Sequence, residues 1–345
     1  MLTAIVCALA LGQAPVLDVP VRLRLDPVQE DADDAAIWVH PTNPGLSLLI
    51  GNDKTAAPVG GLHVYGLDGR VRQKLLGIDR PNNVDVEYGL RLQGRPVDVA
   101  VATERLQRRL RIFAIEPKTR TLRDVSGKTG VFEGEQGERG APMGIGLFRR
   151  PRDGAIFAFV SPKEGPTDGY LGVYRLQPSG GKVDCVPVAR VGRFSGEGEI
   201  EAIVVDDAAG VVFYADEGHS IRKIAADPDS PEFGRQLAEF GHRFYQGDRE
   251  GLAVYDLGGG RGYLLSSNQI KGGSEVLVYD RRSPHALLAR LRLGADDTDG
   301  LDCTSRPLPG FPRGLLAVMN SEGRNYLVAD FGEILQRLNQ SLTRR

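Results

Sequence analysis

The sequence has 345 residues, with 43 basic and 45 acidic side chains and a formal net charge of −2. Because the two signs nearly balance, there is no general basic surface to hold nucleic acid or an anionic membrane, so any anion specificity must come from a local cluster. Glycine is abundant, with 44 residues, and long helical patterns are scarce, which predicts a turn-rich all-β protein.

The first 14 residues, MLTAIVCALALGQA, form an apolar run with small residues near its end. The run is too short to span a bilayer and predicts an export signal cleaved near Ala14, although it lacks a basic start. We therefore expect a secreted or periplasmic protein. Cys185 and Cys303 would remain after cleavage, and their spacing does not determine whether they pair.

The stretch Asp31–His40, DADDAAIWVH, places three carboxylates immediately before an apolar run that ends in the only tryptophan, Trp38. Crowded carboxylates repel one another unless a cation or a basic partner lies among them. The apolar run indicates that this cluster is attached to a buried strand. A solvated acidic turn before a core strand is the alternative interpretation.

One β run recurs six times along the chain, and each copy ends in a polar cluster. The copies are residues 47–54, 97–105, 156–165, 211–219, 262–269 and 313–323. Each has a companion strand upstream and a third strand downstream, with a period of roughly 50 to 60 residues, the size of one propeller blade. The alternating residues 21–25 precede the first unit and are predicted to complete the last blade. The sequence thus predicts a six-bladed β-propeller, with residues 15–345 as one domain.

In a propeller, polar residues at equivalent strand ends converge at one mouth of the central channel. In unit order these are Asp33, Asp34, Asp53 and Lys54; Asn82, Asn83, Asp85, Glu104 and Arg105; Lys163 and Glu164; Glu197, Glu199, Glu201, Asp216 and Glu217; Asp248, Glu250 and Asn268; and Asp297, Asp299, Asn320 and Glu322. Oxygen ligands without a His or Cys cluster favour calcium over zinc. Calcium beside the basic residues would make a local receptor for phosphate groups. The alternative is that many of these charges are ordinary rim residues.

Other chemistries lack their signatures. The sequence contains no GxSxG motif of serine hydrolases and no Walker loop. The five histidines, His40, His63, His219, His242 and His285, lie singly, so we interpret them as surface or turn residues rather than ligands.

With these residues laid out, the chain resembles the β-propeller phytases, a family of calcium-dependent phytate hydrolases. The likeness runs from about Asp31 to Phe331 and depends on the order and spacing of several motifs. These are DADDAAIW at Asp31, NDK at Asn52, NNVDV at Asn82, KEG at Lys163, the Glu201 segment with DD at Asp206 and DE at Asp216, DREGL at Asp248, and DTDGLD at Asp297.

The resemblance implies a role for each matching residue. Phosphate-binding positions match Lys54, Arg105 and Lys163, and calcium-binding or catalytic carboxylates match Glu164, Glu201, Glu217, Asp248, Glu250 and Asp299. Asp33 and Asp34, with the backbone of Ala35 and Val84, match a further calcium position. The resemblance implies several calcium ions, and phytate or another phosphorylated small molecule as the substrate. We expect a monomer that binds neither nucleic acid nor membrane.

The predicted mechanism is attack on one phosphorus by a water that calcium activates. We expect Glu201 and Asp248 to orient this water, and Lys163 and Arg105 to be catalytic with them. No covalent phosphoenzyme is needed.

The chain also departs from the family pattern. Ala35 stands where the family usually has proline, Met143 stands where a tyrosine is expected, and residues 55–60 lengthen a loop beside the predicted cleft. In the last unit, residues 319–323 read MNSEG instead of an aspartate–glycine signature, which weakens the calcium site predicted there. A lactonase-type or other metal-dependent hydrolase, or a non-catalytic propeller that binds anions or a partner, remains the alternative.

Overall fold

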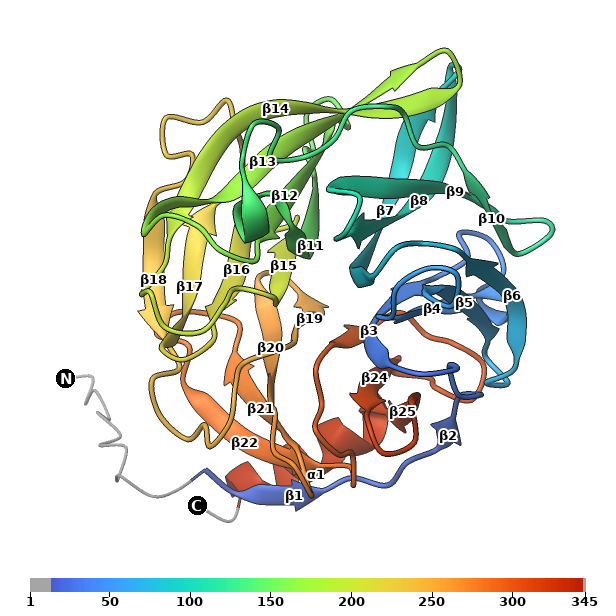
Figure 1. Cartoon of the computed structure of the whole chain (residues 1–345). Helices are drawn as coiled ribbons and strands as arrows, with labels where there is room; N and C mark the ends of the chain where they lie inside the picture. The colour runs from blue at the N-terminus through green and yellow to red at the C-terminus, as the bar shows by residue number, and fades with distance from the viewer. Residues whose placement is uncertain (1–13, 344–345) are drawn as a thin grey trace.

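The computed structural model describes residues 14–343 and consists of six sheets arranged radially around a central channel (Figure 1). The first strand of each sheet lies at the channel, and each following strand lies farther out. The predicted all-β, six-bladed propeller is thus confirmed. The predicted export signal, residues 1–14, lies outside the described residues except for Ala14.

Each blade is an antiparallel sheet whose strands follow one another from the channel outwards. Blades one to three consist of β3 (Ala32–Trp38), β4 (Leu48–Asp53), β5 (Gly61–Gly66) and β6 (Val71–Leu76); β7 (Pro81–Leu92), β8 (Arg95–Glu104), β9 (Arg109–Glu116) and β10 (Thr121–Asp124); and β11 (Pro142–Arg149), β12 (Ile156–Pro162), β13 (Asp168–Ser179) and β14 (Lys182–Arg193). Blades four to six consist of β15 (Ile203–Asp206), β16 (Val211–Asp216), β17 (Ser220–Ala225) and β18 (Gln236–Phe240); β19 (Leu252–Gly258), β20 (Arg261–Asn268), β21 (Glu275–Asp280) and β22 (Leu287–Arg292); and β23 (Leu301–Thr304), β24 (Leu315–Asn320) and β25 (Asn325–Asp330). Two short 3-10 helices, η1 (Pro44–Leu46) and η2 (Gly137–Gly140), lie in loops.

The second strand of each blade explains the repeat seen in the sequence. Every residue of β4, β12, β16 and β24 is buried. A neighbouring blade covers each face of these sheets, so a strand in this position is apolar at nearly every residue rather than at alternate ones. The six repeated apolar runs therefore mark the six blade centres.

The N-terminal segment closes the ring. Strand β2 (Leu23–Arg24) pairs antiparallel with β25, with Leu23 opposite Val328, which confirms the prediction that residues 21–25 complete the last blade. Strand β1 (Val16–Asp18) also adds to blade five, parallel to β22, with Val16 opposite Arg290. This second attachment was not predicted, because three residues are too few to show strand alternation.

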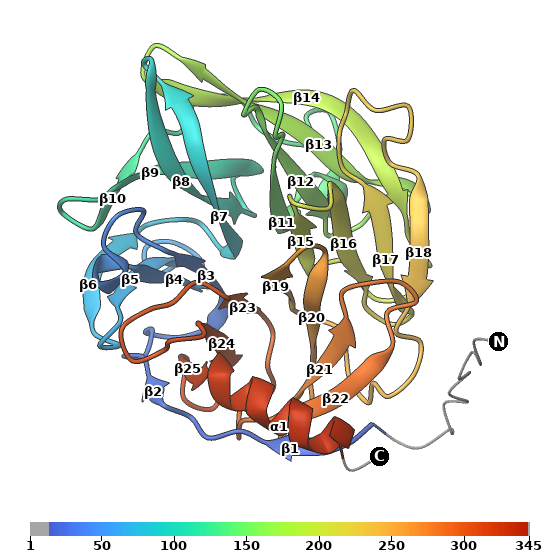
Figure 2. The ribbon, with the colours of Figure 1, turned by 180° about the vertical axis from the view of Figure 1, so that it is seen from behind.

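A C-terminal helix, α1 (Phe331–Thr343), was also not predicted. Figure 2 shows it on the outside of the ring, next to β1. Phe331, Ile334 and Leu338 follow helical spacing and are buried in the core cluster of blades five and six. The ring of Phe331 stacks on that of Tyr255 with 3.4 Å between centroids.

Partly buried aspartates tie neighbouring blades together across the channel wall. Each accepts a hydrogen bond from a backbone N–H of the adjacent blade's first strand. The pairs are Asp302 with Ile37 (2.8 Å), Asp34 with Val84 (3.0 Å), Asp85 with Leu147 (2.7 Å) and Asp207 with Arg149 (3.0 Å). Burial disfavours their charged form and raises the pKa of Asp85 to about 7 and that of Asp34 to about 8.

The two cysteines within the described residues are free and buried. Cys185 belongs to the core cluster between blades two and three, and Cys303 to the cluster of blades five and six. The disulfide left open by the sequence is therefore not formed. Within residues 14–343, no helix is both long enough and apolar enough to cross a bilayer.

Candidate active site

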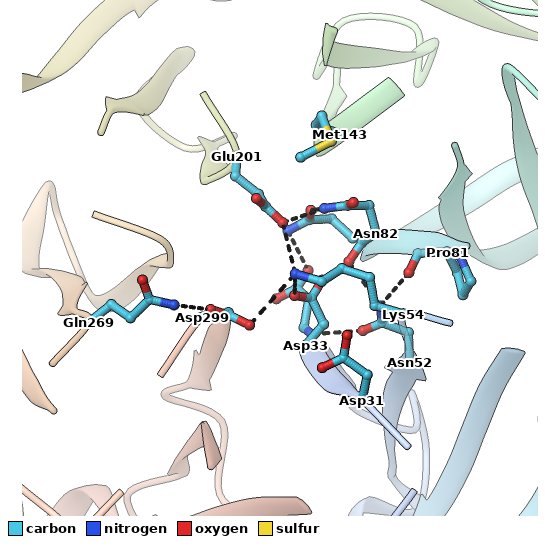
Figure 3. A network of polar contacts seen from close by, with 12 residues as sticks. Asp31, Asp33, Asn52, Lys54, Pro81, Asn82, Met143, Glu201, Gln269 and Asp299 are labelled. Atoms are coloured by element: carbon cyan, nitrogen blue, oxygen red, sulfur yellow. Dashed lines mark hydrogen bonds and ion pairs between the residues drawn. The ribbon is translucent and has the colours of Figure 1, made fainter. Parts of the chain in front are cut away.

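Lys54 lies at the centre of a group of carboxylates from three blades (Figure 3). It directly follows β4, and its N–H donates to the Asp31 carbonyl at 2.8 Å. Its Nζ forms an ion pair with Asp33 of blade one. The same Nζ lies 3.8 Å from Glu201 Oε1 of blade four and 3.7 Å from Asp299 Oδ2 of blade six.

Burial and the charge of an oppositely charged neighbour shift the pKa values of these groups in opposite directions. Burial alone would lower the pKa of Lys54, but the three carboxylates raise it well above its ordinary value, so the ammonium stays charged. Asp33 is 1% exposed, and its burial raises the pKa of that carboxyl despite the attraction of Lys54. Burial also raises the pKa of Glu201 to about 7 and that of Asp299 to about 6. Three carboxyl groups thus share one lysine, and burial favours their protonated forms unless a further cation is present.

Blade four contributes a second cluster beside Glu201. Glu199, Glu201 and Glu217 each offer one carboxylate oxygen, and these three oxygens lie within 4.8 Å of one another. Glu217 accepts a hydrogen bond from the Glu199 N–H at 2.7 Å, while Lys163 forms an ion pair with the Glu199 carboxylate. Burial, with the charge of Glu201 next in importance, raises the pKa of Glu217 to about 8.

The donor set at this mouth fits a calcium ion. Glu250 Oε2 and Asn82 Oδ1 are buried and find no hydrogen-bond partner among residues 14–343, although Asn82 Nδ2 donates to Glu201. Burial and then the charges of Glu201 and Glu217 raise the pKa of Glu250 well above its ordinary value. Clustered carboxylate and amide oxygens without thiolate or imidazole suit a hard cation such as calcium.

A glycine allows Glu201 to take its position. A Cβ at Gly144, in β11, would lie 1.8 Å from the Glu201 carbonyl oxygen. Only glycine therefore lets blade three approach the start of blade four this closely. Met143 precedes Gly144, and Figure 3 shows that its side chain lies beside the network around Lys54. The resemblance to the β-propeller phytases leads us to expect a tyrosine at this position.

Asp34 points to a different place from Asp33. Its Oδ2 accepts hydrogen bonds from the Val84 N–H at 3.0 Å and from Asn83 Nδ2 at 3.1 Å. It lines a channel cavity of about 40 Å³ together with Ala35, Val84 and Glu250. Of the four residues that the resemblance assigns to a further calcium position, Asp34, Ala35 and Val84 lie together at the channel wall, whereas Asp33 pairs with Lys54.

The remaining predicted residues, Arg105, Glu164 and Asp248, form no hydrogen bond or ion pair with Lys54 or its carboxylate partners within residues 14–343. The Arg105 guanidinium lies 3.3 Å from Glu138 Oε2, and the Glu164 N–H donates to the Glu138 carbonyl at 3.4 Å. Glu164 and Asp248 are exposed. The charge of Asp248 contributes to the raised pKa of Glu217, after burial and nearer groups, which indicates that Asp248 faces the blade-four cluster. No contact within the described residues joins Arg105 directly to Glu201.

Sequence reasoning missed two residues of this site. Glu138 pairs with Arg105 from η2, in a loop that has no equivalent in the other blades and gave no signal. Gln269 donates to the Asp299 carboxylate. Gln269 directly follows Asn268, which the sequence analysis includes among the polar residues at strand ends. Including one more residue after each strand would have found Gln269.

Comparisons with known proteins agree with this architecture. A protein-family model described as Phytase matches residues 15–325. The chain is 28% identical over 343 residues to a 3-phytase of Bacillus subtilis strain 168, which covers 93% of this chain and 86% of that protein.

Two solved structures share the fold. A regucalcin from Agrobacterium tumefaciens, described as a calcium-binding protein, has a TM-score of 0.56 at 12% identity and covers 92% of this chain and 95% of that one. A protein of unknown function from Bacteroides thetaiotaomicron has a TM-score of 0.53 at 10% identity and covers 90% of this chain and 75% of that one. At these identities the likeness concerns the fold alone.

Proposed function

The chain belongs to the phytase family and is a phytase, and we propose that it releases phosphate from phytate, myo-inositol hexakisphosphate, in a calcium-dependent reaction. The observation that carries the calcium proposal is the meeting of Lys54 with Asp33, Glu201 and Asp299 beside the Glu199–Glu201–Glu217 cluster. Such a site offers oxygen ligands for cations and an ammonium for a phosphate group.

The carboxylates of the channel mouth would hold the calcium ions. We assign this role to Asp33, Asp34, Glu164, Glu201, Glu217, Asp248, Glu250 and Asp299, and add Glu199 to them because its oxygen lies within 4.8 Å of those of Glu201 and Glu217. Calcium, when bound, supplies the positive charge that neutralises substrate phosphates and promotes ionisation of the attacking water.

The three basic residues would bind substrate phosphates. Lys54, Lys163 and Arg105 now pair with Asp33, Glu199 and Glu138, respectively. Once Asp33 and Glu199 act as cation ligands, Lys54 and Lys163 exchange a carboxylate partner for a phosphate oxygen. Arg105 would bind a phosphate oxygen in place of Glu138. Their charges then stabilise the negative charge that gathers on the phosphoryl oxygens in the transition state.

Glu201 is our candidate for the group that orients the attacking water and takes its proton. Without a metal ion, burial raises its pKa to about 7, and a bound cation would favour the ionised form that a proton acceptor requires. Asp248, whose charge acts on Glu217, is proposed to orient the same water. The water attacks phosphorus in line with the leaving inositol oxygen, so no covalent phosphoenzyme forms.

Inorganic phosphate released from phytate, measured with calcium and after its removal, tests this function. We expect release with calcium and none without it. Equal release in both samples would overturn the calcium dependence, and no release in either would overturn the proposed substrate.

We also propose that the protein is exported as a monomer. The export proposal rests on the apolar residues 1–14 of the sequence. N-terminal sequencing of the mature protein and its elution on a sizing column test the two parts.

A further inference from the structure

Two histidines and a glutamate meet on blade four, outside the network around Lys54. His219 lies in the turn between β16 and β17, Glu239 is in β18, and His242 lies in the loop after β18. Antiparallel pairing brings the end of β18 beside the start of β17, so these three residues gather on the same face as the channel mouth. One ligand atom from each lies within 4.8 Å of the other two.

The glutamate is held so that one oxygen faces both rings. Its Oε2 accepts hydrogen bonds from Arg222 at 2.8 Å and from Gln236 at 3.0 Å. The other oxygen, Oε1, lies 3.5 Å from His219 Nδ1 and 3.8 Å from His242 Nε2. Partners that fix a carboxylate in this way orient metal ligands in proteins.

The distances match a tetrahedral ion. Zinc binds imidazole nitrogen and carboxylate oxygen at about 2.0–2.2 Å in tetrahedral geometry, which places two ligand atoms about 3.4 Å apart. The two measured separations from Glu239 Oε1 are close to this value. The rings of His219 and His242 meet edge to face with 5.4 Å between centroids, which keeps two nitrogen donors on one side of the carboxylate.

We propose that His219, Glu239 and His242 form a binding site for a divalent transition metal ion of the zinc class. Two imidazoles and one carboxylate suit such an ion and not calcium, which takes oxygen ligands. The three side chains are partly exposed, with 38%, 26% and 50% of their surface accessible, so the ion can enter and keep a fourth, solvent ligand. This site is chemically distinct from the carboxylates proposed to hold calcium.

A metal ion here would join two segments that carry candidate active-site carboxylates. His219 is two residues after Glu217, and His242 lies in the loop that leads to Asp248. Arg249 already links these segments, because its guanidinium donates to the carbonyl oxygens of Glu217 and Gly241. The bound ion would add a second link between the same turn and loop.

Cobalt(II) titration of the calcium-saturated protein tests the proposal. Excess calcium occupies the oxygen sites, and tetrahedral Co²⁺ with nitrogen ligands gives intense visible absorption, whereas octahedral Co²⁺ on carboxylates absorbs only weakly. We expect this intense absorption in the native protein. In His242→Ala and Glu239→Gln we expect the affinity for Co²⁺ to fall by about 10-fold or more, because loss of even a supporting group around a metal ligand has an effect of that size.

Glu232→Gln is the matched control, because Glu232 is an exposed glutamate of the same blade that pairs only with Arg235 among the described ion pairs. His242 makes no other ion pair or hydrogen bond within the described residues, so its replacement leaves the fold in place. Zinc is expected to raise the melting temperature of the native protein and of Glu232→Gln but not of His242→Ala. Absence of the tetrahedral spectrum in the native protein, or equal affinity in Glu239→Gln and Glu232→Gln, would overturn the proposal.

Discussion

Lys54 Nζ lies 3.8 Å from Glu201 Oε1, although the two residues belong to blades one and four, which stand opposite each other in the ring. Their side chains therefore reach towards each other across the mouth of the channel (Figure 3). The geometry of the whole ring, rather than any single blade, sets this contact.

Lys54→Met is expected to lower the kcat/KM for phytate by about 100-fold or more, the usual effect of removing one donor that stabilises transition-state charge. The change also leaves Asp33, Glu201 and Asp299 without their shared cation. Phosphate release at saturating calcium measures the effect. Lys74→Met, at an exposed position of β6, is the control, and equal rates in the two variants would exclude Lys54 from the mechanism.

Lys163→Met should lower turnover strongly and leave the fold intact. Its side chain is 28% exposed and forms an ion pair with Glu199 alone among the described residues, so its loss disturbs little packing. Phosphate release and the melting temperature are measured together. Lys182→Met, on an exposed hairpin of the same blade, is the matched control. Near-normal turnover in Lys163→Met would remove this residue from the proposed machinery.

Chelation by EDTA is expected to abolish phosphate release and lower the melting temperature. A cation that binds only the folded state stabilises it by mass action, and the crowded carboxylates around Glu201 repel one another without it. Thermal unfolding with calcium, with EDTA, and with EDTA followed by excess calcium measures the shift. An unchanged melting curve would argue against tightly held calcium.

Asp85→Asn is expected to flatten the pH dependence of stability in calcium-free protein. Burial raises the pKa of Asp85 to about 7, so between about pH 4 and that value the folded state binds a proton that the unfolded state lacks. Stability therefore falls as the pH rises through this window, by at most about 1.4 kcal/mol per pH unit for one proton. Urea unfolding across the window gives the slope, with the exposed Asp168→Asn as control. Parallel slopes in the two variants would contradict the assignment.

The sequence was sufficient to predict the blades because the second strand of each blade is apolar at nearly every residue before its polar end, and such runs can be recognised along the chain. It was also sufficient for the meeting of Lys54 with Glu201, since equivalent strand ends converge in any propeller. Strand β1 and helix α1 were missed because the first has only three residues and the second a single amphipathic stretch at the end of the chain.

Contacts set by loops could not be predicted. Arg105 faces Glu138 only because η2 folds back over the rim, and no periodic pattern encodes that path. His219 and His242 look isolated along the chain, and the pairing of β17 with β18 brings them together. Side chains next to the ends of regular strands were thus predictable, and those positioned farther out in irregular loops were not.

The closure of the ring by β1 and β2 also constrains when the molecule can fold. These strands lie at the start of the described chain, and their partners β22 and β25 lie near its end, so the segments made first are held by segments made last. Contacts of such long sequence separation form slowly. The ring therefore closes only once β22 and β25 have been made, and any shorter nascent chain leaves the edges of its blades unpaired.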